Sequence, residues 1–164
     1  MLVGVAEQGA FTPLCSPRIL EEWARSARKI GPEGEPQARA EIALLHARFP
    51  KADVAPSETL ERRLWLPDPA DIHVLAAAIS GSADQIVTLN AKDFPRNILA
   101  EEGLLRIDPD TLLMQVWQKE PEWVETVGNA VLDTAQRLSG KEWTLRALMK
   151  KARLPRIGKA LTSV

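Results

Sequence analysis

Two aspartates bracket a segment in which a helix, a turn and a strand follow one another closely. Asp71 lies at the start of the predicted helix, and Asp93 follows the apolar run Gln85–Leu89, which is typical of a buried strand. In parallel α/β sheets, ligands bind beyond the carboxyl ends of the strands, where helices begin. We therefore expect the two carboxylates to face the same edge of a sheet.

This arrangement of carboxylates favours a divalent metal site. Carboxylates that lie close together repel each other unless a cation neutralises them, and Mg²⁺ or Mn²⁺ is the cation that oxygen ligands prefer. Glu22 can supply a third oxygen ligand if the helix that begins at Ser16-Pro17 packs beside the two aspartates. Such a metal lowers the pKa of a bound water for attack on a phosphodiester, so the pattern favours a metal-dependent nuclease.

Each of these acidic residues also has an ordinary structural explanation, and spacing alone leaves both explanations open. Asp71 can complement the helix dipole, Asp93 can form a turn, and Glu22 can be a solvent-facing helix residue. We assign Asp68 to helix capping, because Pro69 follows it at the first helical position. We expect His73 at the helix surface or in a hydrogen bond within the core.

The composition is that of a globular protein of one domain, or of one domain with an appendage. Hydrophobic residues make up 45% and charged residues 26% of the 164 residues. Cys15 is the single cysteine, which excludes an internal disulfide and argues against a zinc site. No apolar run approaches the roughly 18 residues of a membrane span. We expect a soluble protein of a reducing cytoplasm, without membrane contact.

Charge is unevenly distributed along the chain although the net charge is only −1. Acidic residues predominate between residues 66 and 110, and basic residues predominate between residues 137 and 159. A cation site beside a polyanion contact would have this distribution. Basic residues near the C-terminus could track an RNA backbone, or form an ordinary basic terminus or a contact for an acidic protein. The candidate RNA-binding residues are Lys150, Lys151, Arg153 and Arg156.

Helices that alternate with short apolar strands predict a parallel sheet with helices on both faces. The predicted strands are Ala10–Cys15, Ala52–Ala55, Gln85–Leu89 and Leu104–Ile107. The predicted helices cover residues 1–8, 16–30, 36–48, 68–81, 96–103, 109–117, 121–138 and 143–151. Strand Gln85–Leu89 is expected to be covered on both faces, and Trp23 to belong to a buried helix stripe. Pro155 and Gly158 predict a C-terminus that loosens.

The segment from Asp71 to Phe94 resembles the PIN-domain family, the VapC-type toxins and PilT N-terminus-like ribonucleases that depend on a metal. The likeness is to the pattern D-x-x-x-L-A-A-A, followed after a turn by A-D-x-I-V-T-x-N-x-K-D-F. Residues 16–23 are similar to the family's S-x-x-I-L-x-E-L helix. The resemblance implies a three-layer α/β fold with a central parallel sheet flanked by helices. It covers residues 1–113 and leaves 114–164 as a helical C-terminal extension.

The resemblance also implies roles for individual residues. Catalytic residues that hold Mg²⁺ or Mn²⁺ would be Glu22, Asp71 and Asp93, with Glu21 as the alternative if the helix register is off by one. Thr88 and Asn90 would orient ligands or the attacking water. The positions that match site-lining places are Ser16, Thr88 and Asn90. Implied partners are RNA, an antitoxin protein and a second copy of the chain in a homodimer.

The chain departs from the family pattern at its start. PIN domains begin with a central strand that ends in an aspartate, whereas Met1–Gln8 resembles the end of the helix that follows that strand. Two interpretations are open: the recorded start is an internal methionine of a longer protein, or the chain is truncated and lacks one acidic ligand. We expect the first, because loss of a central strand would expose the hydrogen-bonding edges of both neighbouring strands.

Three hypotheses about function follow. The first is a PIN-type endoribonuclease, either a toxin of a toxin–antitoxin pair or an RNA-processing enzyme. The alternative is a catalytically inactive PIN-like module that binds RNA or protein, since the first aspartate is missing. A nucleotide-binding α/β domain is disfavoured, because neither G-x-G-x-x-G nor G-x-x-x-x-G-K-[ST] occurs in the chain.

Overall fold

The computed structural model describes residues 1–163, which form two compact units. The middle unit consists of Thr12–Arg106, and the terminal unit joins Met1–Phe11 to the residues from Ile107 onward. Each unit is described by itself. The expected boundary between residues 113 and 114 stays a prediction. Among residues 1–163, no helix is both long enough and apolar enough to cross a membrane.

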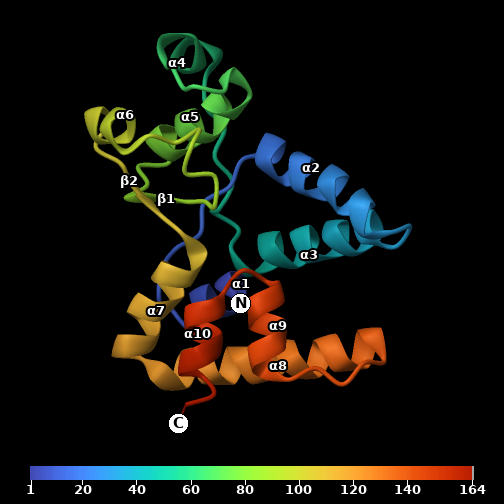
Figure 1. Ribbon diagram of the computed structural model, residues 1–164. Coiled ribbons are helices and arrows are strands. Elements are labelled where there is room, and N and C mark those ends of the chain that lie inside the picture. The colour runs from blue at the N-terminus through green and yellow to red at the C-terminus, as the bar shows by residue number, and fades with distance from the viewer. Residues whose placement is uncertain (164) are drawn as a thin grey trace. The chain divides into compact units, whose positions relative to one another are not determined.

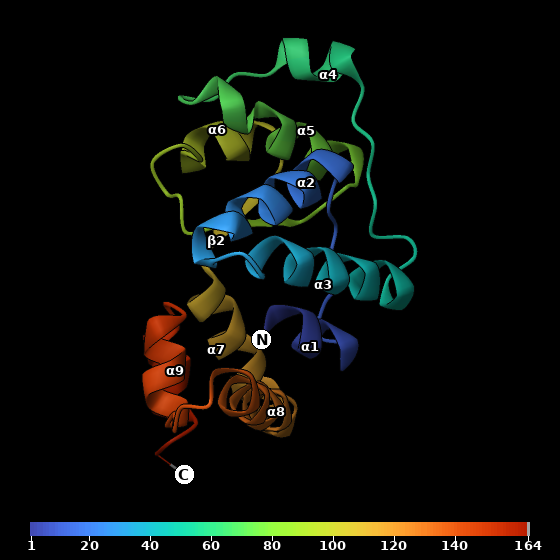
Figure 2. The same ribbon diagram turned by 90° about the vertical axis from the view of Figure 1, so that its right-hand side faces the viewer.

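The middle unit begins with two helices that lie side by side (Figures 1 and 2). They are α2 (Pro17–Ser26), which continues into the 3₁₀ turn η1 (Ala27–Ile30), and α3 (Gly34–Arg48). Ser16 begins α2, because its hydroxyl accepts a hydrogen bond from the backbone N–H of Ile19 at 3.2 Å. Small buried side chains, Ala24 and Ala38 among them, let the two helices pack closely.

The rest of the middle unit is an α/β layer built on a small parallel sheet. Its elements are α4 (Glu58–Arg63), η2 (Pro69–Asp71), α5 (Ile72–Ser80), β1 (Gln85–Val87), α6 (Arg96–Glu101) and β2 (Leu105–Ile107). The apolar side chains of α5, with Leu75 and Ala76 fully buried, pack with Ile86 of β1 and Leu99 of α6 into one core. This architecture confirms the expected α/β class.

The sheet is smaller than the sequence predicts. Strand β1 spans three residues, and only Ile86 is buried, whereas Gln85 and Val87 are exposed. The expectation of a strand covered on both faces is therefore wrong, because the apolar residues of this run alternate between the core and the exposed face. The predicted strands Ala10–Cys15 and Ala52–Ala55 are reduced to a single parallel bridge, Cys15 to Asp53.

The terminal unit is helical. It consists of α1 (Leu2–Glu7), α7 (Pro109–Lys119), α8 (Pro121–Ser139), α9 (Leu145–Lys151) and α10 (Pro155–Ala160). Its core includes Val5 of α1, Val124 of α8 and Met149 of α9, all fully buried. Gly4 lets α1 approach α8, because a Cβ at that position would lie 2.7 Å from Cγ1 of Val127.

The end of the chain forms helix α10 where the sequence predicts a loosening C-terminus, so that expectation is wrong. Pro155 starts the helix, and Asp110 of α7 caps it from a distance in the sequence. The buried Asp110 carboxylate accepts hydrogen bonds from the backbone N–H groups of Arg156 and Ile157, at 2.8 and 2.9 Å. Gly158 does not end the helix. Its lack of a side chain lets α10 approach Met149 closely.

Candidate metal centre

Asp68 and Asp71 are held on one side of the short turn η2. Asp68 has an extended backbone, and its Oδ1 accepts a hydrogen bond from the N–H of Ala70 at 2.9 Å. Pro69 occupies the first position of the turn, where a missing N–H costs nothing. Asp71 ends the three-residue turn that Asp68 caps, so the two side chains leave the chain at opposite ends of one short turn. The turn therefore brings two carboxylates together directly before α5.

Asp93 lies in a braced loop that follows β1. The Thr88 hydroxyl accepts a hydrogen bond from the N–H of Asn90 at 3.0 Å, and Oδ1 of Asn90 accepts one from the N–H of Asp93 at 3.4 Å. The guanidinium of Arg106, on β2, donates to the carbonyl oxygens of Ala91 and Phe94, at 2.5 and 2.9 Å. These contacts fix the backbone that carries Asp93.

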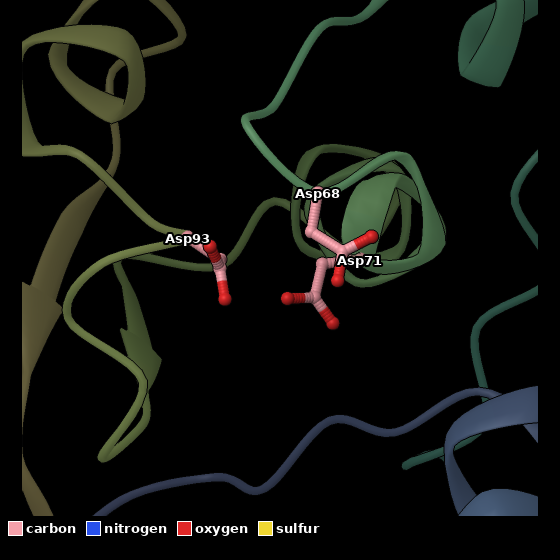
Figure 3. Close-up of side chains that lie close together, drawn as sticks. All are labelled: Asp68, Asp71 and Asp93. Carbon is pink, nitrogen blue, oxygen red and sulfur yellow. The ribbon is translucent and has the colours of Figure 1, made fainter.

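The two segments bring three carboxylates together. Figure 3 shows Asp68 and Asp71 extending from η2, with Asp93 facing them from the loop after β1. One oxygen from each carboxylate lies within 4.8 Å of the others. The side-chain amide of Asn90 donates to Oδ2 of Asp71 at 3.1 Å, which links the loop to the turn. The expected meeting of Asp71 and Asp93 at one edge of the sheet is therefore present, with Asp68 added.

Among the described residues, the charge of this carboxylate cluster has no lysine or arginine partner. Within residues 1–163, no lysine or arginine forms an ion pair with Asp68, Asp71 or Asp93. Burial raises the pKa of the Asp71 carboxyl, and the neighbouring charges of Asp68 and Asp93 raise it further. A group of hard oxygen donors with unbalanced negative charge fits a divalent cation such as Mg²⁺ or Mn²⁺.

The comparisons with known proteins identify the family. A family model described as PIN domain matches residues 1–92, which is more than half of the chain. The chain belongs to the PIN-domain family. No curated protein and no solved structure matches it. The match includes Glu22, Asp68 and Asp71 and ends one residue before Asp93.

Membership of the PIN-domain family indicates some properties in general terms. PIN domains have nuclease-type activity, bind RNA and typically use divalent metals. The carboxylate cluster of Asp68, Asp71 and Asp93 is the place in this PIN domain whose chemistry agrees with metal use.

Glu22 lies close to the carboxylate cluster of the PIN domain without being one of its three members. Its charge contributes to the raised pKa of Asp71, but its Oε1 lies 3.3 Å from Nε of Arg18 and 3.2 Å from Nε2 of His73. Glu21, the alternative in the helix register, is bound by Arg25 and Arg39 on the side of α2 that meets α3. The role of Glu22 as a metal ligand stays a prediction.

The residues expected to line the site divide into two groups. Thr88 and Asn90 belong to the loop that carries Asp93, and Asn90 contacts Asp71 directly. Ser16 is buried and uses its hydroxyl to cap α2, and no hydrogen bond within residues 1–163 joins it to the carboxylates. Asn90 thus holds an oxygen of the cluster, whereas the described role of Ser16 is structural.

Sequence reasoning missed three residues around this cluster. Asp68 was assigned to capping alone, yet it caps η2 with one oxygen and belongs to the cluster; its i, i+3 spacing to Asp71 is the signal for this. Arg106, which holds the loop of Asp93, carries no recognisable sequence signal. Trp65 is 64% exposed three residues before Asp68, and the buried residues on both sides of it, Leu64 and Leu66, are the signal that it points outward.

The candidate RNA-binding residues lie in the terminal unit. Lys150 and Lys151 occupy the last turn of α9, and the ammonium of Lys151 lies 5.0 Å from the ring centre of Trp143. Arg153 adopts a left-handed backbone conformation with φ of 60° in the turn before α10. Arg156 donates from its guanidinium to the Thr111 hydroxyl at 3.0 Å. Their role toward RNA stays a prediction.

Proposed function

We propose that this PIN-domain protein is a metal-dependent endoribonuclease whose centre is the carboxylate cluster of Asp68, Asp71 and Asp93. The observation that carries the proposal is the meeting of three carboxylates, unpaired with any described lysine or arginine, in a family with nuclease-type activity. Mg²⁺ or Mn²⁺ is the proposed cofactor. The roles of toxin, antitoxin partner and homodimer, and the cytoplasmic location, remain predictions from the resemblance and the composition.

The residues of the cluster have separate tasks in this proposal. A divalent metal, when bound, would lower the pKa of a water and polarise a phosphoryl oxygen, which makes the phosphorus easier to attack. Asn90 fixes Oδ2 of Asp71, so Oδ1 of Asp71 stays available as a ligand. Neither carboxylate oxygen of Asp93 accepts a hydrogen bond within the described residues, and the braced loop places this side chain across from Asp68 and Asp71 (Figure 3). Preorganised oxygens of this kind hold a cation without first having to move.

Trp65 favours a nucleic acid with unpaired bases as the substrate. The indole is mostly exposed, and Trp65 lies three positions before Asp68 in the chain, which places their Cα atoms at most about 10 Å apart. A base that stacks on an exposed aromatic ring contributes about 1–3 kcal/mol to binding. Unpaired bases can stack in this way, whereas the bases of a duplex are already stacked on one another. We therefore expect single-stranded RNA to be cut in preference to duplex RNA.

The proposal is tested by cleavage of a labelled single-stranded RNA pool with Mn²⁺ or with EDTA. The parent chain is expected to cut only with Mn²⁺, and Asp71→Asn and Asp93→Asn are expected to lose cleavage while remaining folded. Asp84→Asn is the matched control, because Asp84 is an exposed aspartate outside the cluster. Cleavage by Asp71→Asn at the parent's rate would refute the assignment of the cluster.

A binding module without catalysis is the second candidate. The observation that favours it is that the carboxylates that lie together are those of Asp68, Asp71 and Asp93, with Glu22 not among them. Such a module would bind the same RNA in Mn²⁺ and in EDTA and would cut it in neither. The two candidates are therefore separated by measuring binding and cleavage on the same RNA.

A further inference from the structure

His73 is a buried residue whose polar atoms have no ordinary partner. It lies on α5, two residues after Asp71, and its side chain is 2% exposed. Within residues 1–163, neither ring nitrogen makes a hydrogen bond of good geometry. Buried polar atoms are nearly always hydrogen-bonded, so an exception of this kind calls for a specific reason.

The ring of His73 lies close to a carboxylate on another helix. Its Nε2 lies 3.2 Å from Oε1 of Glu22, which α2 carries. This separation lies at the upper end of the range for an N–H···O hydrogen bond, although the geometry is not that of a formed hydrogen bond. A small rotation of the exposed Glu22 side chain would complete the bond. The contact joins α2 to α5 beside Asp71.

One oxygen of Glu22 lies near two basic side chains. Arg18, one turn earlier on α2, donates from Nε to Oε1 at 3.3 Å, and His73 approaches the same Oε1. Oε2 of Glu22 accepts no hydrogen bond within the described residues. The carboxylate is therefore anchored by one oxygen while the other is left for an additional partner.

We propose that His73 is a positioning residue that holds Glu22 by Oε1, so that Oε2 serves as a fourth oxygen ligand next to the carboxylate cluster. This inference rests on the proposed function. The contact requires only a hydrogen on Nε2, which a neutral imidazole of the correct tautomer can supply. Because the ring is buried in α5, it cannot follow a displaced Glu22, and this rigidity suits a group that orients a metal ligand.

The test is Mn²⁺ affinity of the full chain, measured by electron paramagnetic resonance of the free ion. Residues that orient metal ligands typically contribute about 10–100-fold to metal affinity. We expect His73→Ala to weaken Mn²⁺ binding within that range and Glu22→Gln to weaken it similarly. The double variant is expected to bind no more weakly than Glu22→Gln alone, because His73 acts through Glu22. His73→Gln, whose amide can donate, is expected to restore part of the affinity.

A matched control separates positioning from general damage. His46→Ala removes a histidine whose Nε2 lies 3.1 Å from Oδ1 of Asp53, a carboxylate outside the cluster, and should leave Mn²⁺ affinity unchanged. Thermal unfolding in EDTA checks that each variant is folded. Where His73→Ala does not fold, His73→Leu replaces it in the single and double variants, because leucine fills the buried space without donating a hydrogen bond.

The possible outcomes distinguish this inference from the proposed function. If the parent binds no Mn²⁺, or if Asp71→Asn binds it equally well, the proposed function fails and the inference fails with it. If Asp71→Asn loses binding while His73→Ala and the parent bind alike, only the positioning role of His73 is overturned. It is also overturned if the losses of His73→Ala and Glu22→Gln multiply in the double variant.

Discussion

Replacing Asp71 with asparagine should stabilise the protein without metal and destabilise it relative to the parent with metal. Asp71 lies among like charges, and burial together with Asp68 and Asp93 raises the pKa of its carboxyl. Asparagine removes the charge, and its side-chain oxygen can still accept the hydrogen bond from Asn90. The substitution therefore relieves repulsion while keeping the local geometry.

The size of this effect follows from the spacing of the cluster. Two unit charges 4.8 Å apart repel by about 0.9 kcal/mol in water, the appropriate medium because Asp68 is exposed. Physiological salt reduces the repulsion of Asp71 by Asp68, and its repulsion by Asp93, by about half each. Some repulsion persists in the unfolded chain, since Asp68 and Asp71 are neighbours in sequence. A stabilisation of about 0.5–1 kcal/mol remains, equivalent to a rise in Tm of about 2–4 °C at most.

The pH dependence of this difference has a definite sign. An acid whose pKa is raised by folding binds its proton more tightly in the folded state, so the parent loses stability as pH rises through that pKa. The stability that Asp71→Asn gains over the parent should therefore be at its maximum at neutral pH. It should disappear below the ordinary pKa of an aspartate, where Asp71 is protonated in both folded and unfolded chains.

Urea unfolding in EDTA and in Mn²⁺, followed by circular dichroism, measures these quantities. Mn²⁺ at 100 times its Kd should stabilise the parent by about 2.7 kcal/mol and leave Asp71→Asn unchanged, which reverses their order. Asp84→Asn should behave as the parent in both conditions, because Asp84 lies outside the cluster. The reasoning is refuted if Asp71→Asn is the less stable protein in EDTA at neutral pH, or if it gains as much from Mn²⁺ as the parent.

Three further predictions concern residues outside the cluster. Asp110→Ala should lower the free energy of unfolding, measured in urea, by about 2–3 kcal/mol. The reason is that two backbone N–H groups of α10 lose a buried charged acceptor. A loss below about 0.5 kcal/mol would contradict this. Hydrogen bonds from Arg28 and Arg39 lower the pKa of Glu35 from 4.5 to about 2, so the stability that Glu35 contributes should be complete above pH 4.5 and be lost progressively as pH falls from there through about 2. An NMR titration midpoint near 4.5 would argue against this. Burial raises the pKa of the Cys15 thiol. Iodoacetamide should therefore label the thiol slowly at pH 8 in the folded protein and quickly in urea. Equal labelling rates would show that the thiol is accessible in the folded protein.

Much of the fold could be predicted because many of its helices are specified by local signals. Ser16 and Asp108 each begin a helix, and the side-chain oxygen of each accepts a hydrogen bond from the backbone N–H three residues later. A proline follows each of these two residues. These devices depend on neighbouring residues alone, so the sequence reveals them. The α/β class was predictable for a similar reason, since apolar runs alternate with helical patterns.

The features that could not be predicted depend on residues far apart in the chain. Helix α10 is short, and although Pro155 stands at its start, the carboxylate that caps it comes from Asp110 on α7, which no neighbouring residue reveals. Trp23 fits a helical stripe but is 41% exposed, because the small residue Ala24 rather than the indole packs between α2 and α3. Strand β1 reads as a buried strand by composition, yet no described element covers its outer face enough to bury Val87.

The candidate site was predictable in part for the same physical reasons. Asp71 and Asp93 follow from the rule that helix starts and strand ends share one edge of a parallel sheet. The approach of Arg106 to the loop of Asp93, and of His73 to Glu22, depends on packing between elements. Spacing cannot predict such contacts, because it describes each element alone.

The measurement that tests the central claim most directly is the number of Mn²⁺ ions that the chain binds, counted by electron paramagnetic resonance. The account predicts saturable binding that Asp71→Asn and Asp93→Asn abolish and that Asp84→Asn leaves unchanged. Mg²⁺ should compete for the same site, because both ions prefer oxygen ligands. Absence of saturable binding, or binding that persists in Asp71→Asn and Asp93→Asn, would contradict the assignment of a metal centre to this cluster.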